Sequence, residues 1–245
     1  MTDRTAIVNP VKGKYPPQIG GTAIIAATEA DLQMIARLAA APLVEHRNLY
    51  MSHLRIFANE DCRFSLVGPV IGAPYAAMIL ETLVVWGVDQ VLFVGWCGAV
   101  SVNVRAGDLI LPETAMVDEG TSGHYCGPSC RLSFPDRSLA GRVEEALTHC
   151  GADFHAGAVW TTDAIFRETV EKVRHYQENG ALAVEMEVSA IFTVAAFREI
   201  AAAGILVVSD EVSDYRWRPG FRMPAFGDAR KKACQTALKV AGDSG

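Results

Sequence analysis

Two carboxylates stand at the start of an apolar run, ALAVEMEVSAIFTVAAFREI, at residues 181–200. Glu185 and Glu187 are one residue apart among side chains that favour burial. An ionised carboxylate is costly to bury unless it is paired or hydrogen-bonded. The two acids are therefore either partnered within the fold or held ready for a ligand. A third acid, Asp210, follows Ser209 at the end of the apolar stretch GILVVSD. Such an aspartate could act as a general acid at the rim of a cleft, or it could cap the next segment.

Two glycine-containing turns follow predicted strands, VGPVIGAP at residues 67–74 and VGWCGAV at residues 94–100. Glycine permits a ligand to approach the backbone closely, and a helix start favours anions. A tight strand-to-helix turn would explain the first stretch equally well. In the second, Cys97 has no basic neighbour in the sequence, so we expect a packed side chain and not a nucleophile.

The stretch HYCGPSC places His124, Cys126 and Cys130 within seven residues. A structural zinc site needs four ligands with characteristic pair spacing, and the sequence shows no second pair. Metal binding is therefore not expected. The cysteines are scattered through a chain with ample material for a core, which makes free thiols in a reducing cytosol the simpler interpretation. The six cysteines are Cys62, Cys97, Cys126, Cys130, Cys150 and Cys234.

Composition bounds the class of protein. The chain has 245 residues, of which 50% are hydrophobic, enough for one substantial core. Its 22 basic and 28 acidic residues give a net charge of −6 without a basic cluster, which argues against a nucleic-acid partner. The first residues are polar and proline-rich, and the most apolar region is interrupted by polar residues and glycines. We expect a cytoplasmic protein with no membrane partner.

Short β-branched runs alternate with stretches of helical period, which indicates an α/β fold with helices covering a central sheet. We predict one domain over residues 21–245, preceded by an N-terminal extension over residues 1–20. Chemistry in such folds collects at the carboxyl ends of strands. The predicted strands are 22–27, 64–68, 90–95, 108–117, 156–162 and 204–210. The predicted helices are 29–40, 72–86, 137–149, 167–178, 187–203 and 224–241.

Taken in order, these pieces resemble the purine nucleoside and uridine phosphorylase superfamily, which also contains nucleosidases. The resemblance spans roughly residues 22–212 and rests on GPVIGAP, VGWCGAV, RAGDLILPETAMVDEGTSGHY, TTDAIF, AVEMEVSA and VVSD. It implies a single domain with a central mixed, mainly parallel sheet flanked by helices. It also implies that Met186 and Glu187 contact a ribose, with Glu185 beside them. A carboxylate suits a sugar diol because it accepts hydrogen bonds without donating any.

The resemblance further implies that Asp210 protonates a departing purine, with Ser209 holding it in place. An acid is needed because a neutral base leaves an oxocarbenium-like sugar more easily than an anion does. Pyrimidine-specific relatives lack this aspartate, so a purine-like base is favoured. Relatives stack an aromatic residue on the base from a D-x-F segment. Here TTDAIF puts Ile165 at that place and Phe166 one position later.

The phosphate ligands of the family are largely replaced. Ala27 stands for a glycine, Asp31 and Phe93 for arginines, and Trp96 for a threonine. Only Arg47 matches, as the arginine that a neighbouring subunit donates. Losing charged hydrogen-bond donors costs about 1.5–3 kcal/mol each. The residues predicted for the acceptor pocket are Arg47, Gly95, Trp96 and Cys97.

These observations leave several functions open. The first is a nucleoside phosphorylase that uses phosphate as co-substrate and no other cofactor. The second is a nucleosidase in which Asp31 activates water, although Asp31 could equally be a first-turn residue favoured by the helix dipole. A third is a nucleoside-binding protein without catalysis, and the weakest is a metal-dependent hydrolase using His124, Cys126 and Cys130. Because Arg47 acts only across an interface, the resemblance implies a homo-oligomer, either a dimer or a hexamer.

Overall fold

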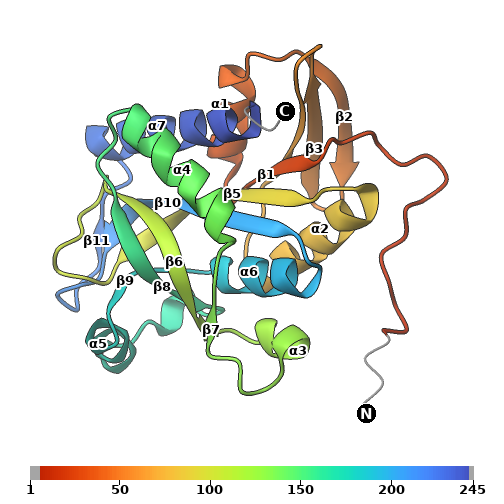
Figure 1. Cartoon of the computed structure of the whole chain (residues 1–245). Helices are drawn as coiled ribbons and strands as arrows, with labels where there is room; N and C mark the ends of the chain where they lie inside the picture. Colours follow the sequence, from red (N-terminus) through yellow and green to blue (C-terminus); the bar gives the residue numbers. More distant parts are fainter. Residues whose placement is uncertain (1–5, 243–245) are drawn as a thin grey trace.

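Strand β5 (Gln90–Ala99) lies at the centre of the sheet in the computed structural model, which describes residues 6–242 (Figure 1). Its first half pairs in parallel with β1 (Thr22–Ala26), and β10 (Ala201–Glu211) pairs in parallel along its whole length. The other strands are β2 (Leu43–Leu49), β3 (Ser52–Ala58), β4 (Arg63–Gly68), β6 (Leu109–Asp118), β7 (Leu132–Ser133), β8 (His155–Thr162), β9 (Ala181–Glu185) and β11 (Arg218–Pro219).

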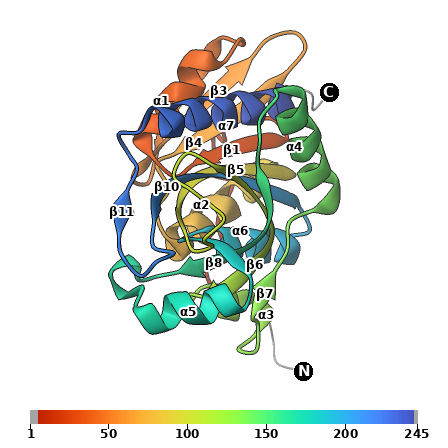
Figure 2. The ribbon, with the colours of Figure 1, turned by 90° about the vertical axis from the view of Figure 1, so that its left-hand side faces the viewer.

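The sheet closes on itself at one end. Strand β10 also pairs with β6, β6 with β8, β8 with β9, and β9 returns to β5. These strands therefore form a closed ring, and their curvature can be followed in Figure 2. Strands β1, β4, β3 and β2 continue outward from β5 as an open sheet. The predicted α/β domain with a central mixed sheet is confirmed, with parallel pairing at its centre and antiparallel pairing in the β2–β3–β4 meander.

Helices cover both faces of the sheet (Figure 1). Alternate residues of β5 point to opposite faces, so Leu92 joins one core and Phe93 the other. The Phe93 core includes apolar residues of α2 (Ala73–Trp86) and α6 (Val188–Phe197). The Leu92 core includes residues of α1 (Glu29–Leu38), α4 (Arg137–His149) and α7 (Pro224–Gly242). The remaining helices are α3 (Ser122–Cys126), α5 (Val170–Glu178) and a 3-10 turn η1 (Ile165–Arg167).

Helix starts follow local sequence signals. Thr28, Asp136 and Thr169 are extended residues whose side chains accept a hydrogen bond from the first turn of α1, α4 and α5. All six predicted helices and all six predicted strands are present, with shifts of a few residues at their ends. The largest error concerns the helix predicted over residues 187–203. It ends at Phe197 and its last residues belong to β10, because Glu199 has a left-handed φ of 58° that breaks the helix.

The sequence did not indicate the β2–β3 hairpin or β9. Strand β2 is the exposed edge of the sheet and its sequence LVEHRNL shows no clear alternation. The predicted N-terminal extension has neither helix nor strand over residues 6–20, and residues 1–5 lie outside the described part of the chain. Within residues 6–242, no helix has the length and apolar character needed to cross a bilayer.

The expectation of six free cysteines is wrong for two of them. Cys126 and Cys130 form a disulfide, whereas Cys62, Cys97, Cys150 and Cys234 are free. The turn through Gly127 and Pro128 brings the two Cα atoms to 5.8 Å, within the range that a disulfide requires. A sequence separation of four residues gave no sign of this turn geometry.

Candidate active site

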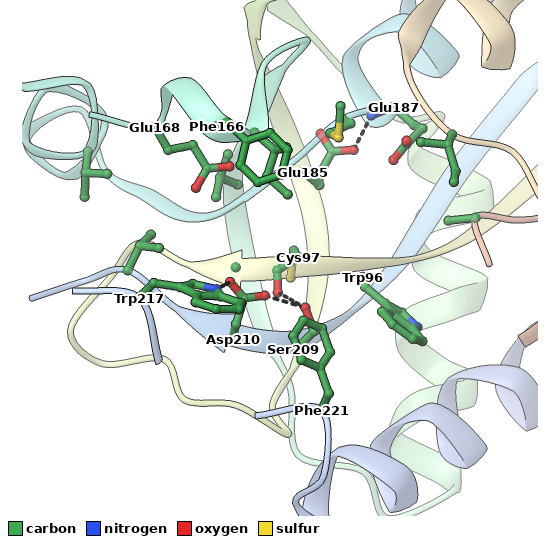
Figure 3. Close-up of a pocket in the computed structure, with 18 of the residues that line it drawn as sticks. Trp96, Cys97, Phe166, Glu168, Glu185, Glu187, Ser209, Asp210, Trp217 and Phe221 are labelled. Atoms are coloured by element: carbon green, nitrogen blue, oxygen red, sulfur yellow. Dashed lines mark hydrogen bonds between the residues drawn. The ribbon is translucent and has the colours of Figure 1, made fainter. Parts of the chain in front are cut away.

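A cavity of about 540 Å³ opens at the carboxyl ends of the central strands (Figure 3). This is where ligands bind in open α/β sheets. Residues from several parts of the fold line it. Among them are Ala27 and Thr28 after β1, Trp96, Cys97 and Gly98 of β5, Ile165, Phe166 and Glu168 around η1, Glu185, Met186 and Glu187 where β9 meets α6, and Ser209, Asp210, Arg216, Trp217 and Phe221 from β10 onward.

Glu185 is held by the fold itself. Its Oε2 accepts hydrogen bonds from the backbone N–H groups of Glu187 at 2.6 Å and Val188 at 2.7 Å, and its Oε1 accepts one from the hydroxyl of Thr161. It therefore caps the N-terminus of α6, where unpaired N–H groups need an acceptor. Burial raises the pKa of Glu185, against the effect of these hydrogen bonds. Its first role is to fix the chain that carries Met186 and Glu187.

Glu187 is the carboxylate offered to the cavity. Only 5% of the residue is exposed, and its Oε1 accepts a hydrogen bond from the backbone N–H of Gly72 at 2.6 Å. Burial, and then the nearby charge of Glu185, raise its pKa. Gly72 begins α2 with a φ of 85°, which a residue with a side chain rarely adopts. The turn in GPVIGAP thus positions a ligand-facing carboxylate.

Asp210 lies on another wall of the same cavity. The hydroxyl of Ser209 is 2.6 Å from Asp210 Oδ1, and the indole Nε1 of Trp217 donates to Oδ2 at 2.9 Å. Burial raises the pKa of Asp210, although these two hydrogen bonds favour the ionised form. Gly98 leaves room for the carboxyl group, since a Cβ there would lie 3.3 Å from Oδ2. A partly buried carboxyl group with a raised pKa is suited to proton donation.

Aromatic and aliphatic side chains surround the mouth of the cavity. Ile165 and Phe166 both line it, because η1 is a 3-10 turn and the strand rule that turns neighbouring side chains apart does not apply. Phe166 is 95% exposed and Trp217 66%. No sequence signal indicated Trp217, Phe221 or Glu168, which lie in loops without periodicity.

Asp31 does not reach the cavity wall. Its Oδ1 accepts a hydrogen bond from Arg230 at 2.7 Å, and its Oδ2 accepts from Trp96 Nε1 at 2.5 Å and Thr28 Oγ1 at 3.0 Å. The side chain is 1% exposed. The guanidinium of Arg230 also lies 5.2 Å from the Trp96 ring centroid. The indole of Trp96 faces the cavity where the sequence placed a water-activating carboxylate, so the geometry does not favour that role for Asp31.

Two other predicted pocket residues lie elsewhere in this chain. Arg47 is exposed on β2, pairs with Glu45 and donates to the carbonyl of Tyr15 at 3.1 Å. Gly95 is inside β5, where a Cβ would lie 2.6 Å from the ring of Phe93 and not in the cavity.

Cys97 lines the cavity but is buried, and burial raises the pKa of its thiol well above the usual value. It is therefore protonated at neutral pH and is not an activated nucleophile. Within residues 6–242, no group of three or more His, Cys, Asp or Glu side chains is arranged to hold a metal ion.

The sequence pattern of the phosphorylase superfamily matches residues 22–241, nearly all of the described chain. The chain belongs to this superfamily.

Relatives within the phosphorylase superfamily include the DeoD-type purine nucleoside phosphorylases of Bacillus cytotoxicus and Bacillus cereus. Each is 31% identical to this chain over 159 residues, which are 61% of this chain and 64% of the relative. The matched region is thus less than two thirds of those proteins. The crystal structure of uridine phosphorylase from Vibrio fischeri has the same fold, with a TM-score of 0.81 and 23% identity over 93% of this chain and 94% of that one.

Replacing Arg230 with methionine should destabilise this superfamily member by about 3–5 kcal/mol, because Asp31 is left as a buried charge without its partner. The double variant Arg230→Met, Asp31→Asn should recover part of the loss. Urea unfolding measures both. Arg222→Met, at an exposed position in the same part of the chain, is the control and should change stability by about 0.5 kcal/mol or less. Equal stability of wild type and Arg230→Met would contradict a structural role for the pair.

Replacing Glu187 with glutamine should stabilise the fold at high pH. The pKa of Glu187 is raised to about 8, so the folded state keeps a proton that the unfolded chain releases above its ordinary pKa. Stability therefore falls as pH rises through this window, and glutamine escapes the loss. Since one pKa unit is about 1.4 kcal/mol, we expect a gain of at least about 1 kcal/mol at pH 8 that shrinks toward pH 5.

Melting curves at the two pH values measure this difference, with the exposed Glu171→Gln as the matched control. A gain for Glu187→Gln that is the same at pH 5 and pH 8 would show that Glu187 is not held protonated by the fold.

Proposed function

We propose that this chain cleaves the N-glycosidic bond of purine-like nucleosides and transfers the sugar to phosphate. The observation that carries the proposal is the presence, on two walls of one cavity, of Glu187 and Asp210. Both are carboxyl groups whose pKa is raised by burial: Glu187 lies where it can hydrogen-bond a sugar diol, and Asp210 lies where it can give a proton to a departing base. A binding protein without catalysis has no need for the second group.

The sugar binds beside Met186 and Glu187 in this proposal. The backbone N–H of Gly72 and the cap formed by Glu185 hold the Glu187 carboxyl group in place before the substrate arrives. Such preorganisation reduces the conformational entropy lost on binding. Hydrogen bonds from ribose hydroxyl groups to Glu187 also strengthen as positive charge develops on the sugar ring in the transition state.

The base binds between Asp210 and the apolar side chains at the mouth of the cavity. Ile165, Phe166 and Phe221 offer surface for a planar ring. Protonated Asp210 donates its proton to a ring nitrogen of the base as the glycosidic bond breaks, so that the base leaves as a neutral molecule. The hydrogen bonds from Ser209 and Trp217 then stabilise the carboxylate that remains.

The acceptor side of the cavity supports a second candidate. Asp31 neutralises Arg230, and Trp96 occupies the wall between them and the cavity. Arg216 lines the cavity from the segment after β10. For phosphate as acceptor, we propose that Arg47 of a second copy of this chain completes the anion site. Without that contribution, water is the acceptor and the products are base and free sugar.

A panel of purine and pyrimidine nucleosides, incubated with and without phosphate, tests the proposal through the released base and the sugar product. We expect purine release that depends on phosphate and yields a sugar 1-phosphate. Equal release without phosphate, with free sugar as product, would replace the phosphorylase proposal with the hydrolytic one. No release from any nucleoside, together with measurable binding, would mean that the chain is a binding protein.

Replacing Asp210 with asparagine should lower kcat for purine nucleosides about 10²–10⁴-fold, because the side chain keeps its shape but cannot donate the proton. KM should change much less, since the sugar contacts remain. Steady-state kinetics measure the split. Asp214→Asn is the control, because Asp214 is an exposed carboxylate paired with Arg218 outside the cavity. Near-normal turnover by the Asp210 variant would remove this residue from the mechanism.

A further inference from the structure

Glu168 is a carboxyl group in the cavity that the proposed reaction does not use. It lies between η1 and the N-cap Thr169 of α5, and it lines the same cavity as Asp210. Figure 3 shows the Glu168 and Asp210 side chains directed toward the same space, with Phe166 beside Glu168. Two acids from segments distant in the sequence, the η1–α5 junction and the end of β10, thus converge on the place where the base binds.

The side chain of Glu168 makes no hydrogen bond or ion pair with any other residue between 6 and 242, although it is half-buried. Burial, and then the charge of Asp210, raise its pKa to about 7. A half-buried polar group without a partner is costly unless a ligand supplies one. The charged groups that face it across the cavity are Asp210 on β10, Arg216 after β10, and Glu185 and Glu187 at the β9–α6 junction. Arg167 and Glu171 flank it along its own segment.

The two protonation states of Glu168 have opposite hydrogen-bonding character. An ionised carboxylate only accepts hydrogen bonds, whereas a protonated carboxyl group can donate one. A purine that turns a nitrogen of its five-membered ring toward Asp210 presents its 6-substituent on the same edge. A 6-amino group donates hydrogen bonds, and a 6-oxo group accepts them. The charge state of a neighbouring carboxyl group therefore discriminates between the two bases.

We propose that Glu168 is a specificity residue that contacts the 6-substituent of the purine and favours a 6-amino base when it is ionised. This inference rests on the proposed function, because it requires a purine with its ring nitrogen at Asp210. At pH 8 an ionised Glu168 accepts a hydrogen bond from a 6-amino group and repels a 6-oxo group. At pH 6 the protonated group donates to a 6-oxo group, and the preference for the amino base declines.

The experiment compares kcat/KM for adenosine and inosine from pH 6 to pH 8 in the wild type, Glu168→Gln and Glu171→Gln. The ratio of the two values cancels changes in folding and in the shared catalytic groups. For the wild type, the adenosine-to-inosine ratio should rise with pH. For Glu168→Gln, whose amide both donates and accepts, the ratio at pH 8 should fall about tenfold and lose its pH dependence. Glu171→Gln changes an exposed carboxylate on the next helix and should behave as the wild type does.

The outcomes separate this inference from the proposed function. A wild-type ratio that does not vary with pH, or a Glu168→Gln ratio equal to that of wild type, would overturn the role of Glu168 while leaving nucleoside cleavage intact. Cleavage of pyrimidine nucleosides alone would also overturn it, with bond cleavage still established. Failure to release base from any nucleoside would overturn the proposed function instead. Titration of the purified protein with free adenine and hypoxanthine should show the same pH-dependent preference in binding.

Discussion

The capping of α6 by Glu185 is the interaction on which the site depends. This buried carboxyl group joins three elements. Glu185 is the last residue of β9, and its side chain accepts hydrogen bonds from the hydroxyl of Thr161 on β8 and from the backbone N–H groups at the start of α6. The helix start in turn fixes Glu187, and Gly72 at the start of α2 holds its side chain from the opposite direction. The two acids in AVEMEVSA are thus one support and one ligand group. Their separation by a single residue follows from this division, because the capping acid must precede the helix and the ligand group must occupy its N-cap.

A second buried carboxylate with hydrogen-bond partners, Asp31, shapes the part of the cavity where the sugar acceptor is proposed to bind. Asp31 is completely buried. Its burial is tolerated because Arg230, Trp96 and Thr28 donate hydrogen bonds to both of its carboxylate oxygen atoms. The ion pair with Asp31 neutralises the charge of Arg230 close to the cavity. The indole ring of Trp96, which also bonds to Asp31, forms part of the cavity wall. An anion that enters here meets an aromatic surface and a neutralised arginine. Under the phosphorylase proposal, the charges that bind phosphate therefore have to come from other segments, such as Arg216, or from another copy of the chain.

Local patterns made most of the fold predictable, because β-branched runs and helical periods are short-range signals. The failures arose where tertiary context decides. The polar edge strand β2 has no buried face to give it alternation, and the apolar run after Glu187 concealed the change from α6 to β10. Glu187 and Asp210 stood out as acids in apolar runs, their roles were predicted through the resemblance to a family, and the structure places both at one cavity. The link from Gly72 to Glu187 spans 115 residues, and that kind of contact leaves no mark in a sequence pattern.

Exposed aromatic residues lie at the mouth of the cavity. Phe166 and Trp217 leave most of their surface in water, a cost that a folded chain does not carry without compensation when such side chains gather at one cavity. In the proposed reaction, a planar base that stacks on Phe166 removes apolar surface from water and shields the carboxyl groups of the cavity. Shielding raises the cost of a negative charge on Glu168, which a hydrogen bond donated by the base offsets while Asp210 keeps its proton until the glycosidic bond breaks. The apolar side chains at the mouth therefore suit the faces of a planar heterocycle, and the carboxyl groups of Asp210 and Glu168 suit the polar atoms along its edge.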